Sequence, residues 1–301
     1  MRPITLQEPF RALFYAPFYC TIARDAFAAQ GVEVTVQPGR VPPLEADAVL
    51  AGAAHVAWGG PMRILLAHEK DPESPLRNFG AAILGDPFLL VGREPRPDFA
   101  LQDLAGLTLG TVSEVPTPWW TLQDDLRRAG MDPDAIRRVT DQPMGENAAA
   151  VAEGRLDVAQ LFEPLVSAME LAGTGHVWHA CAARGPTSYT TFYSTVANIA
   201  EYEAEFMAMI RALAETQRWF HAAPEEEVAE CIKPFFPDMD QAPMVRAIAR
   251  YRALGIWTET PHFPPEPFER LQAALLSAGA ISRPPGYARC VDEAITLKAL
   301  A

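Results

Sequence analysis

The chain has 301 residues, a formal net charge of −13, 49% hydrophobic residues and 21% charged residues. This balance is typical of a globular protein with a substantial core, and the negative charge disfavours nucleic acid as a partner because phosphate backbones would be repelled. No apolar stretch approaches the roughly 20 residues of a membrane-spanning helix, so we expect no membrane insertion. The length suits two α/β lobes.

The four cysteines, Cys20, Cys181, Cys231 and Cys290, are far apart and form no CxxC pair. This spacing indicates neither a zinc site nor a dense disulfide framework, and we expect no metal and no cofactor. The N-terminus lacks a basic region followed by an apolar segment. That pattern predicts no secretory signal, and therefore a cytoplasmic location if the chain is native as written.

An internal repeat with a shift of about 100 residues organises the first half of the chain. Gly31 and Gly130 each end a helical pattern that begins near a proline, and Gly52 and Gly154 each follow a second helix and precede a buried strand. Each copy therefore predicts a βαβ unit. Because ligands bind outside the carboxyl ends of strands in open α/β sheets, the two units should face one shared cleft.

The segment 86–93 reads as a strand that carries the chain into the second lobe, and 188–195 reads as the returning strand, since it is rich in β-branched and aromatic residues. Four helices are predicted after it, at 203–222, 225–235, 241–254 and 268–278, and they should pack on lobe one. The predicted lobes are 1–87 with 193–301, and 88–192.

This order of elements resembles a known family through five segments: 16–19 (Ala-Pro-Phe-Tyr), 52–61, 98–110, 162–164 (Phe-Glu-Pro) and 250–257. They resemble the nitrate, sulfonate and thiamine-precursor branch of ABC-importer substrate-binding proteins, over nearly the whole chain. The resemblance implies an α/β, two-lobed type II periplasmic-binding-protein-like fold, with a ligand cleft between the lobes. It also implies an ABC permease as partner, a periplasmic location and a monomeric state.

The same family contains enzymes that make the thiamine pyrimidine with pyridoxal phosphate held on a lysine. That chemistry needs a lysine near the cleft and a histidine beside the early proline, whereas Lys70 lies at the far end of a helix and Pro17 follows Ala16. The leading hypothesis is therefore binding without catalysis. The alternative is an enzyme on the same fold (a pyrimidine synthase, a decarboxylase or a desulfinase), for which Cys20 and His55 could form a thiolate–imidazole pair unless Cys20 is a core residue.

In lobe one, Trp58-Gly59-Gly60 follows a buried strand and precedes a helix. This position predicts that Trp58 lies at the cleft edge and that both glycines let backbone N–H groups approach a ligand, although Trp58 could instead belong to the lobe core. Arg63, one turn into the helix, could clamp a carboxylate, pair across the cleft or lie on the surface.

In lobe two, the loop 111–118 leads into a helix and offers Ser113, Glu114 and Thr117 to a ligand. Trp119 could stack on a planar ligand or join the core. Glu163 ends the strand equivalent to the one before Gly59, so it could accept hydrogen bonds from ligand N–H groups or form a salt bridge to the facing lobe.

The remaining candidates are aromatic walls and one loop carboxylate: Tyr15, Phe18, Phe88, Tyr189 and Glu146. His176, His179 and Cys181 are metal-ligand residue types, but a strand would direct His176 to the opposite face. Aromatic faces with few polar groups favour a small organic ligand: a flat nitrogen heterocycle resembling the thiamine pyrimidine, or an aromatic or other organic acid.

Overall fold

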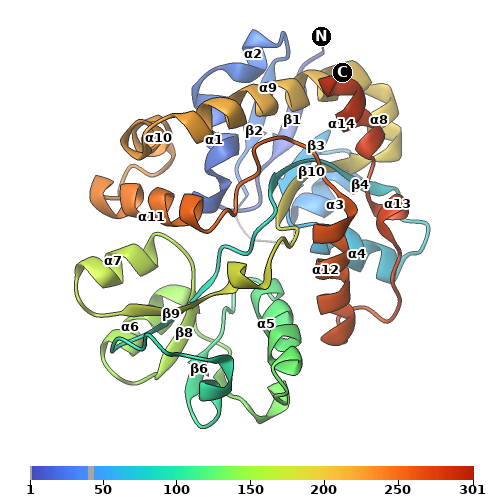
Figure 1. The fold of residues 1–301 in the computed structure, drawn as a ribbon. Coiled ribbons are helices and arrows are strands. Elements are labelled where there is room, and N and C mark those ends of the chain that lie inside the picture. The colour runs from blue at the N-terminus through green and yellow to red at the C-terminus, as the bar shows by residue number, and fades with distance from the viewer. Residues whose placement is uncertain (1, 40–43) are drawn as a thin grey trace.

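The structure is a computed structural model that describes residues 2–39 and 44–301, and it has two lobes, one above the other in Figure 1. The sheet of the first lobe contains β1 (Ile4–Gln7), β2 (Val34–Gln37), β3 (Val56–Gly59), β4 (Leu76–Ile83) and β10 (Thr190–Thr195), in the order β2-β1-β3-β10-β4. β1, β2 and β3 are parallel, and β10 lies antiparallel between β3 and β4.

The sheet of the second lobe repeats this plan in the order β7-β6-β8-β5-β9. Its strands are β5 (Leu89–Gly92), β6 (Thr108–Gly110), β7 (Arg137–Val139), β8 (Val158–Leu161) and β9 (His176–Ala180). The predicted repeat is confirmed, because β2-β1-β3 and β7-β6-β8 are equivalent parallel triplets. Gly52 and Gly154 end equivalent helices with φ of 73° and 74°, a left-handed conformation that favours glycine.

Helices cover both faces of each sheet (Figure 1). The first lobe begins with α1 (Ala16–Ala23), α2 (Ala26–Ala29), α3 (Leu44–Leu50) and α4 (Met62–Lys70), and the second contains α5 (Thr117–Arg128), α6 (Met144–Ala152) and α7 (Leu165–Leu171). The C-terminal part adds α8 (Val196–Glu201), α9 (Glu203–Ala222), α10 (Glu225–Ile232), α11 (Gln241–Ala253), α12 (Pro265–Ser277), α13 (Tyr287–Cys290) and α14 (Glu293–Leu300). Within the described ranges, every helix is too short or too polar to cross a bilayer.

Strand alternation assigns the core residues of the first lobe to its two faces. In the β3–β10 register, Trp58 pairs with Phe192 and Ala57 pairs with Tyr193. Trp58 and Phe192 belong to the apolar cluster that also contains buried residues of α1 and α9, whereas Ala57 and Tyr193 belong to the cluster with α4 and α12. Successive side chains point to opposite faces of a strand, so the strand register determines that Trp58 packs on the face of the sheet covered by α1 and α9.

The crossing segments follow the prediction with two differences. β10 begins at Thr190 and pairs with β3 and β4, so residues 190–192, predicted to lie in the second lobe, belong to the first sheet. The C-terminal helices contact both lobes, because α11 packs against α7 and α12 packs against α5, while α9 and α10 pack on α1 as expected. The expectation that these helices pack on lobe one is therefore right for α9 and α10 and incomplete for α11 and α12, which also contact the second lobe.

Candidate functional site

A cavity lies between the lobes, at the ends of the strands where the repeat predicted a cleft. Its walls come from both lobes and from both crossing segments: Phe10, Phe14, Tyr15, Gly60, Met62, Arg63, Phe88, Val115, Thr117, Ser188, Tyr189 and Leu271. The free space between these side chains is about 30 Å³, room for only a few water molecules. Pockets that hold organic ligands usually measure roughly 300 Å³ or more, so a ligand can enter only if the lobes separate or the rings move.

Arg63 supplies the charge of this cavity. It lies in the first turn of α4 and is only 9% exposed. A surface position, one of the alternatives that the sequence left open for Arg63, is therefore excluded. Among the described lining residues it is the one with a charged side chain. A β-carbon on Gly60 would lie 3.3 Å from Arg63 Nη1, so the absent side chain at Gly60 leaves room for the guanidinium.

Hydroxyl groups supply the other polar contacts. Ser188 Oγ and Tyr189 Oη are buried and have no hydrogen-bond partner within the described part of the chain. Burial raises the pKa of Tyr189 well above its ordinary value, so the phenol stays protonated and can donate a hydrogen bond. Thr117, the first residue of α5, adds a helix N-terminus, which carries partial positive charge.

The structure brings six of the fourteen predicted site residues together around the cavity: Tyr15, Gly60, Arg63, Phe88, Thr117 and Tyr189. Gly59 lies one residue before the cavity, in β3, where it pairs with Thr191. Six lining residues were not predicted: Ser188 and five apolar residues, Phe10, Phe14, Met62, Val115 and Leu271. The apolar side chains look like core residues in the sequence, and only the meeting of the lobes places them at the cavity.

Trp58 and Phe18 do not reach the cavity, and the prediction that Trp58 lies at the cleft edge is wrong. Both side chains are 0% exposed, and their rings stack with centroids 5.0 Å apart and an angle of 5° between the planes. The cause is strand alternation, which directs Trp58 onto α1 in the lobe core. A place in the lobe core was the alternative that the sequence left open for Trp58.

Glu163 has the second of the two roles that the sequence left open, the salt bridge to the facing lobe. Its carboxylate is fully buried and pairs with Arg250 of α11. Ser167 donates to it through its backbone N and its Oγ, both at 2.9 Å. Burial raises the pKa of Glu163 despite the opposing charge of Arg250.

The other second-lobe candidates point away from the cavity. Ser113, Glu114 and Glu146 are exposed, and Glu114 Oε1 accepts a hydrogen bond of 2.9 Å from Met144 N at the start of α6. Trp119 packs in the second-lobe core, where the Arg138 guanidinium lies 4.0 Å from the centre of a Trp119 ring. In the loop 111–118, Val115 and Thr117 line the cavity.

The proposed thiolate–imidazole pair does not form. Cys20 is buried against Cys231, and burial raises the pKa of the Cys20 thiol well above its usual value. The His55 ring instead accepts a hydrogen bond of 2.8 Å from Thr5 N through Nδ1. Among the described residues there is no group of three or more histidine, cysteine or acidic side chains able to hold a metal ion.

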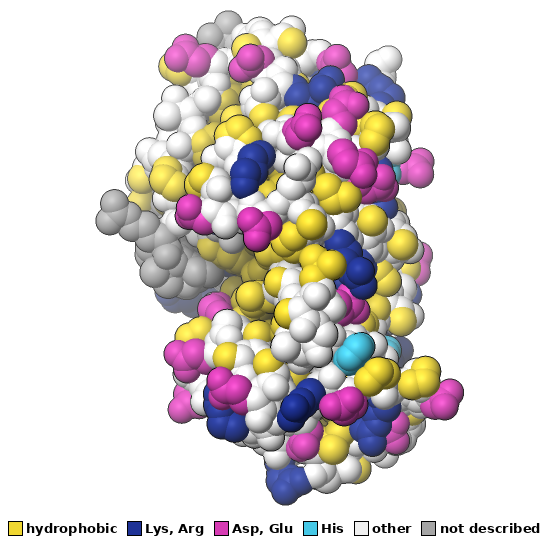
Figure 2. All heavy atoms as spheres, turned by 90° about the vertical axis from the view of Figure 1, so that its left-hand side faces the viewer, with side chains coloured by type: hydrophobic (Ala, Val, Ile, Leu, Met, Phe, Trp, Pro, Cys, Tyr) yellow, Lys and Arg dark blue, Asp and Glu magenta, His cyan; other side chains and the backbone are white. Residues whose placement is uncertain are grey.

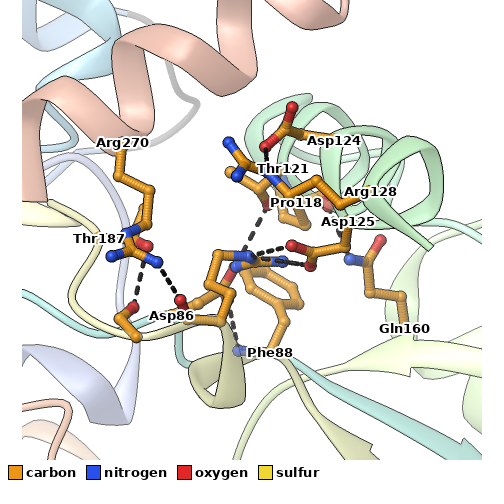
Figure 3. Close-up of polar contacts among 12 residues, drawn as sticks. Asp86, Phe88, Pro118, Thr121, Asp124, Asp125, Arg128, Gln160, Thr187 and Arg270 are labelled. Carbon is orange, nitrogen blue, oxygen red and sulfur yellow. Dashed lines mark hydrogen bonds and ion pairs between the residues drawn. The ribbon is translucent and has the colours of Figure 1, made fainter. Parts of the chain in front are cut away.

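Sequence reasoning missed a buried ionic cluster that joins the two crossing segments (Figure 3). Asp86 precedes β5, and Arg184 follows β9. The Arg184 guanidinium pairs with Asp86 and donates from Nε to both Asp125 oxygens, at 3.1 and 2.9 Å. Thr121 Oγ1 also donates to Asp86, at 3.3 Å. The cluster therefore holds α5 against the two crossing segments, beside Phe88 and Ser188, which line the cavity.

Comparison with known proteins places this geometry in context. The family model described as "NMT1/THI5 like" matches residues 14–227. A Bacillus subtilis relative, named "Putative binding protein YtlA", is 24% identical over 297 residues, which cover 98% of this chain and 89% of the relative.

Two similar solved structures share the fold of this chain over nearly its whole length. The periplasmic aliphatic sulphonate binding protein SsuA from Escherichia coli superposes with a TM-score of 0.79 at 14% identity, covering 97% of this chain and 92% of that one. A mutant of the enzyme DSZB in complex with biphenyl-2-sulfinic acid superposes with a TM-score of 0.72 at 14% identity, covering 100% and 99%.

Proposed function

Because the chain belongs to the NMT1/THI5-like family, we propose that it is a solute-binding protein of an ABC-type import system and that its ligand is an organic anion with an apolar, ring-sized body. The single observation that carries this proposal is the Arg63 guanidinium in a cavity otherwise lined by aromatic, aliphatic and hydroxyl-bearing side chains. Its partner is then a permease, and its place of action is outside the cytoplasm.

The charge in the cavity favours an acid over a nitrogen heterocycle. Arginine binds planar or tetrahedral oxyanions through two parallel N–H donors, and the Ser188 and Tyr189 hydroxyls can donate further hydrogen bonds to the same oxygens. A basic heterocycle would need a carboxylate acceptor, but Glu163, the buried candidate, is held by Arg250. We therefore favour the organic-acid half of the ligand prediction.

The rest of the wall favours a ring or a branched alkyl body. Phe14 and Phe88 both contact Phe162, with ring centroids 5.4 and 5.3 Å apart, and Tyr189 lies 6.3 Å from Phe14. Such rings stack on apolar ligands edge-to-face or offset. In support, SsuA is described as an aliphatic sulphonate binding protein and DSZB was solved with an aromatic sulfinic acid.

An enzyme on this fold is the second candidate, because DSZB is described as a desulfurization enzyme. The cavity favours binding: its described lining offers no thiol, imidazole, amine or carboxylate, the groups that most often act as nucleophile or general base. Cys20 lies in the core with its pKa raised, which disfavours the thiolate that a desulfinase of this kind would use.

Titration calorimetry with matched ligands tests the proposal. Benzenesulfonate and benzoate are compared with benzenesulfonamide and benzamide, which keep the ring and lose the charge, and with 4-amino-2-methylpyrimidine. We expect binding by at least one acid and binding weaker by about tenfold or more for its amide. Tighter binding of the aminopyrimidine, or equal binding of acid and amide, would refute the anionic ligand. Mass spectrometry after incubation tests turnover, and a converted acid would favour the enzyme.

A further inference from the structure

A network of ion pairs joins the two lobes at one edge of the cavity. Arg250 on α11 pairs with Glu163, which follows β8, and with Glu170 on α7. Arg246, one turn earlier on α11, donates to Glu170 from Nε and Nη2 at 3.0 and 2.7 Å. Figure 2 shows the side of the molecule on which α7 and α11 lie, with hydrophobic side chains visible in the waist between the lobes.

The two partners belong to different lobes. α11 is fixed to the first lobe, because Arg252 pairs with Glu225 of α10 at 2.9 Å and donates to Ala223 O at 2.7 Å. Glu163 and Glu170 move with the second sheet, through β8 and α7. The contacts of Arg250 must therefore break when the lobes separate.

The network is also continuous with the cavity wall. Phe162, next to Glu163, packs against Phe14 and Phe88, and both of these rings line the cavity. Tyr251, next to Arg250, accepts a hydrogen bond of 2.9 Å from Glu163 N and donates one of 3.1 Å to Pro87 O in the first crossing segment. A ligand that moves these rings moves the residues that hold the ion pairs.

We propose that Arg250 is a positioning residue for lobe closure: its ion pairs with Glu163 and Glu170 form an interlobe latch that stabilises the closed form and must open to admit the ligand. The inference rests on the proposed function, because it assumes that ligand enters by lobe separation. Arg250 is not among the described residues that line the interlobe cavity, so its effect on binding is through the equilibrium between open and closed forms.

The energetics of such a pair suit a reversible latch. Glu163 is 0% exposed and Arg250 is 17% exposed at the side chain, so the closed form desolvates both charges, and this cost offsets much of their attraction. In the open form both charges return to water. Removing Arg250 alone leaves an unpaired carboxylate buried in the closed form only, which shifts the equilibrium towards the open form.

The test compares three variants without ligand. Arg250→Met removes the latch. Arg250→Met with Glu163→Gln also removes the carboxylate that would be left buried. Arg128→Met is the matched control, since Arg128 pairs with Asp124 at 2.6 Å and both lie on α5. Small-angle X-ray scattering measures opening, and hydrogen exchange of the Glu163 amide reports its bond to Tyr251.

We expect Arg250→Met to increase the radius of gyration and to accelerate exchange of the Glu163 amide by about tenfold or more, a factor that corresponds to roughly 1.4 kcal/mol. In the double variant both the radius of gyration and the exchange rate should return towards the wild-type values. Arg128→Met should give the wild-type values. The latch would be overturned if Arg250→Met had the same scattering and exchange rate as the wild type. It would also be overturned if the double variant were no more closed than Arg250→Met.

If Arg250→Met does not fold by circular dichroism, the same measurements are made on Glu163→Gln with Glu170→Gln, which removes both acids and should also open the lobes. Unchanged scattering in that variant would equally overturn the proposal. Because no ligand is present, these results are independent of the calorimetric screen: failure of the anion proposal leaves them unaffected, and their failure leaves the screen standing.

Discussion

Replacing Arg63 by methionine should weaken binding of the best acid from the screen without unfolding the protein. The guanidinium is 9% exposed and lies in the interlobe cavity, so salt screens it little and its hydrogen bonds to an anion are charge-assisted. Losing such an interaction costs about 2 to 3 kcal/mol, which corresponds to roughly 30- to 150-fold in Kd. Methionine retains apolar bulk, so the cavity wall is largely preserved.

The assay is titration calorimetry with benzenesulfonate or benzoate, whichever binds tighter to the parent. Arg63→Lys should fall between the parent and Arg63→Met, because an ammonium keeps the charge and loses the planar fork. Arg128→Met, on the exposed end of α5, should bind like the parent. If Arg63→Met is folded by circular dichroism and binds the acid within about twofold of the parent, the anion does not contact Arg63 and the proposed ligand orientation is wrong.

Three further outcomes are expected. Trp58→Ala should lower the free energy of unfolding in urea by about 3 to 5 kcal/mol. Trp58→Phe should bind the acid like the parent. If a folded Trp58→Phe binds about tenfold more weakly, Trp58 contributes to the ligand site after all. Arg184→Met leaves the buried Asp86 carboxylate uncompensated and should cost about 3 to 5 kcal/mol; adding Asp86→Asn should recover part of it, and no recovery would argue against the ion pair. In the molecules whose lobes stay closed, Arg250→Met should raise the pKa of the buried Glu163 further, although Ser167 still donates to it, because the neighbouring Glu170 and Tyr251 supply no positive charge. The folded form then binds the proton more tightly than the unfolded one, so stability falls as pH rises from the ordinary glutamate pKa through the raised one; a fall in melting temperature between pH 5 and pH 8 no larger than in the parent would contradict this.

The sequence by itself determined the two repeated βαβ units, because the signals for them are local. Gly52 and Gly154 end equivalent helices, a buried strand follows each of them, and the period of about 100 residues repeats the unit. Cap glycines and apolar periodicity act within a few residues of the chain. They therefore predicted a βαβ unit in each lobe and both crossing strands.

The sequence also indicated candidate site residues at strand ends and helix starts, and three of them, Arg63, Thr117 and Tyr189, line the interlobe cavity. The sequence could not decide that Arg63 faces the cavity and Trp58 does not. Both follow Gly52 within 11 residues, but the strand register directs one side chain into the lobe core and the helix directs the other towards the cavity.

Only the tertiary structure decided which charges line the cavity and which are buried in ion pairs between distant segments. Glu163 and Arg250 are 87 residues apart, and Asp86 and Arg184 are 98 apart, so no local pattern links either pair. A buried, desolvated carboxylate needs a cation within contact distance. Which cation reaches it depends on how α11 and the two crossing segments pack between the lobes. That packing holds Glu163 at the lobe boundary, and it leaves Arg63 as the charge that faces the cavity.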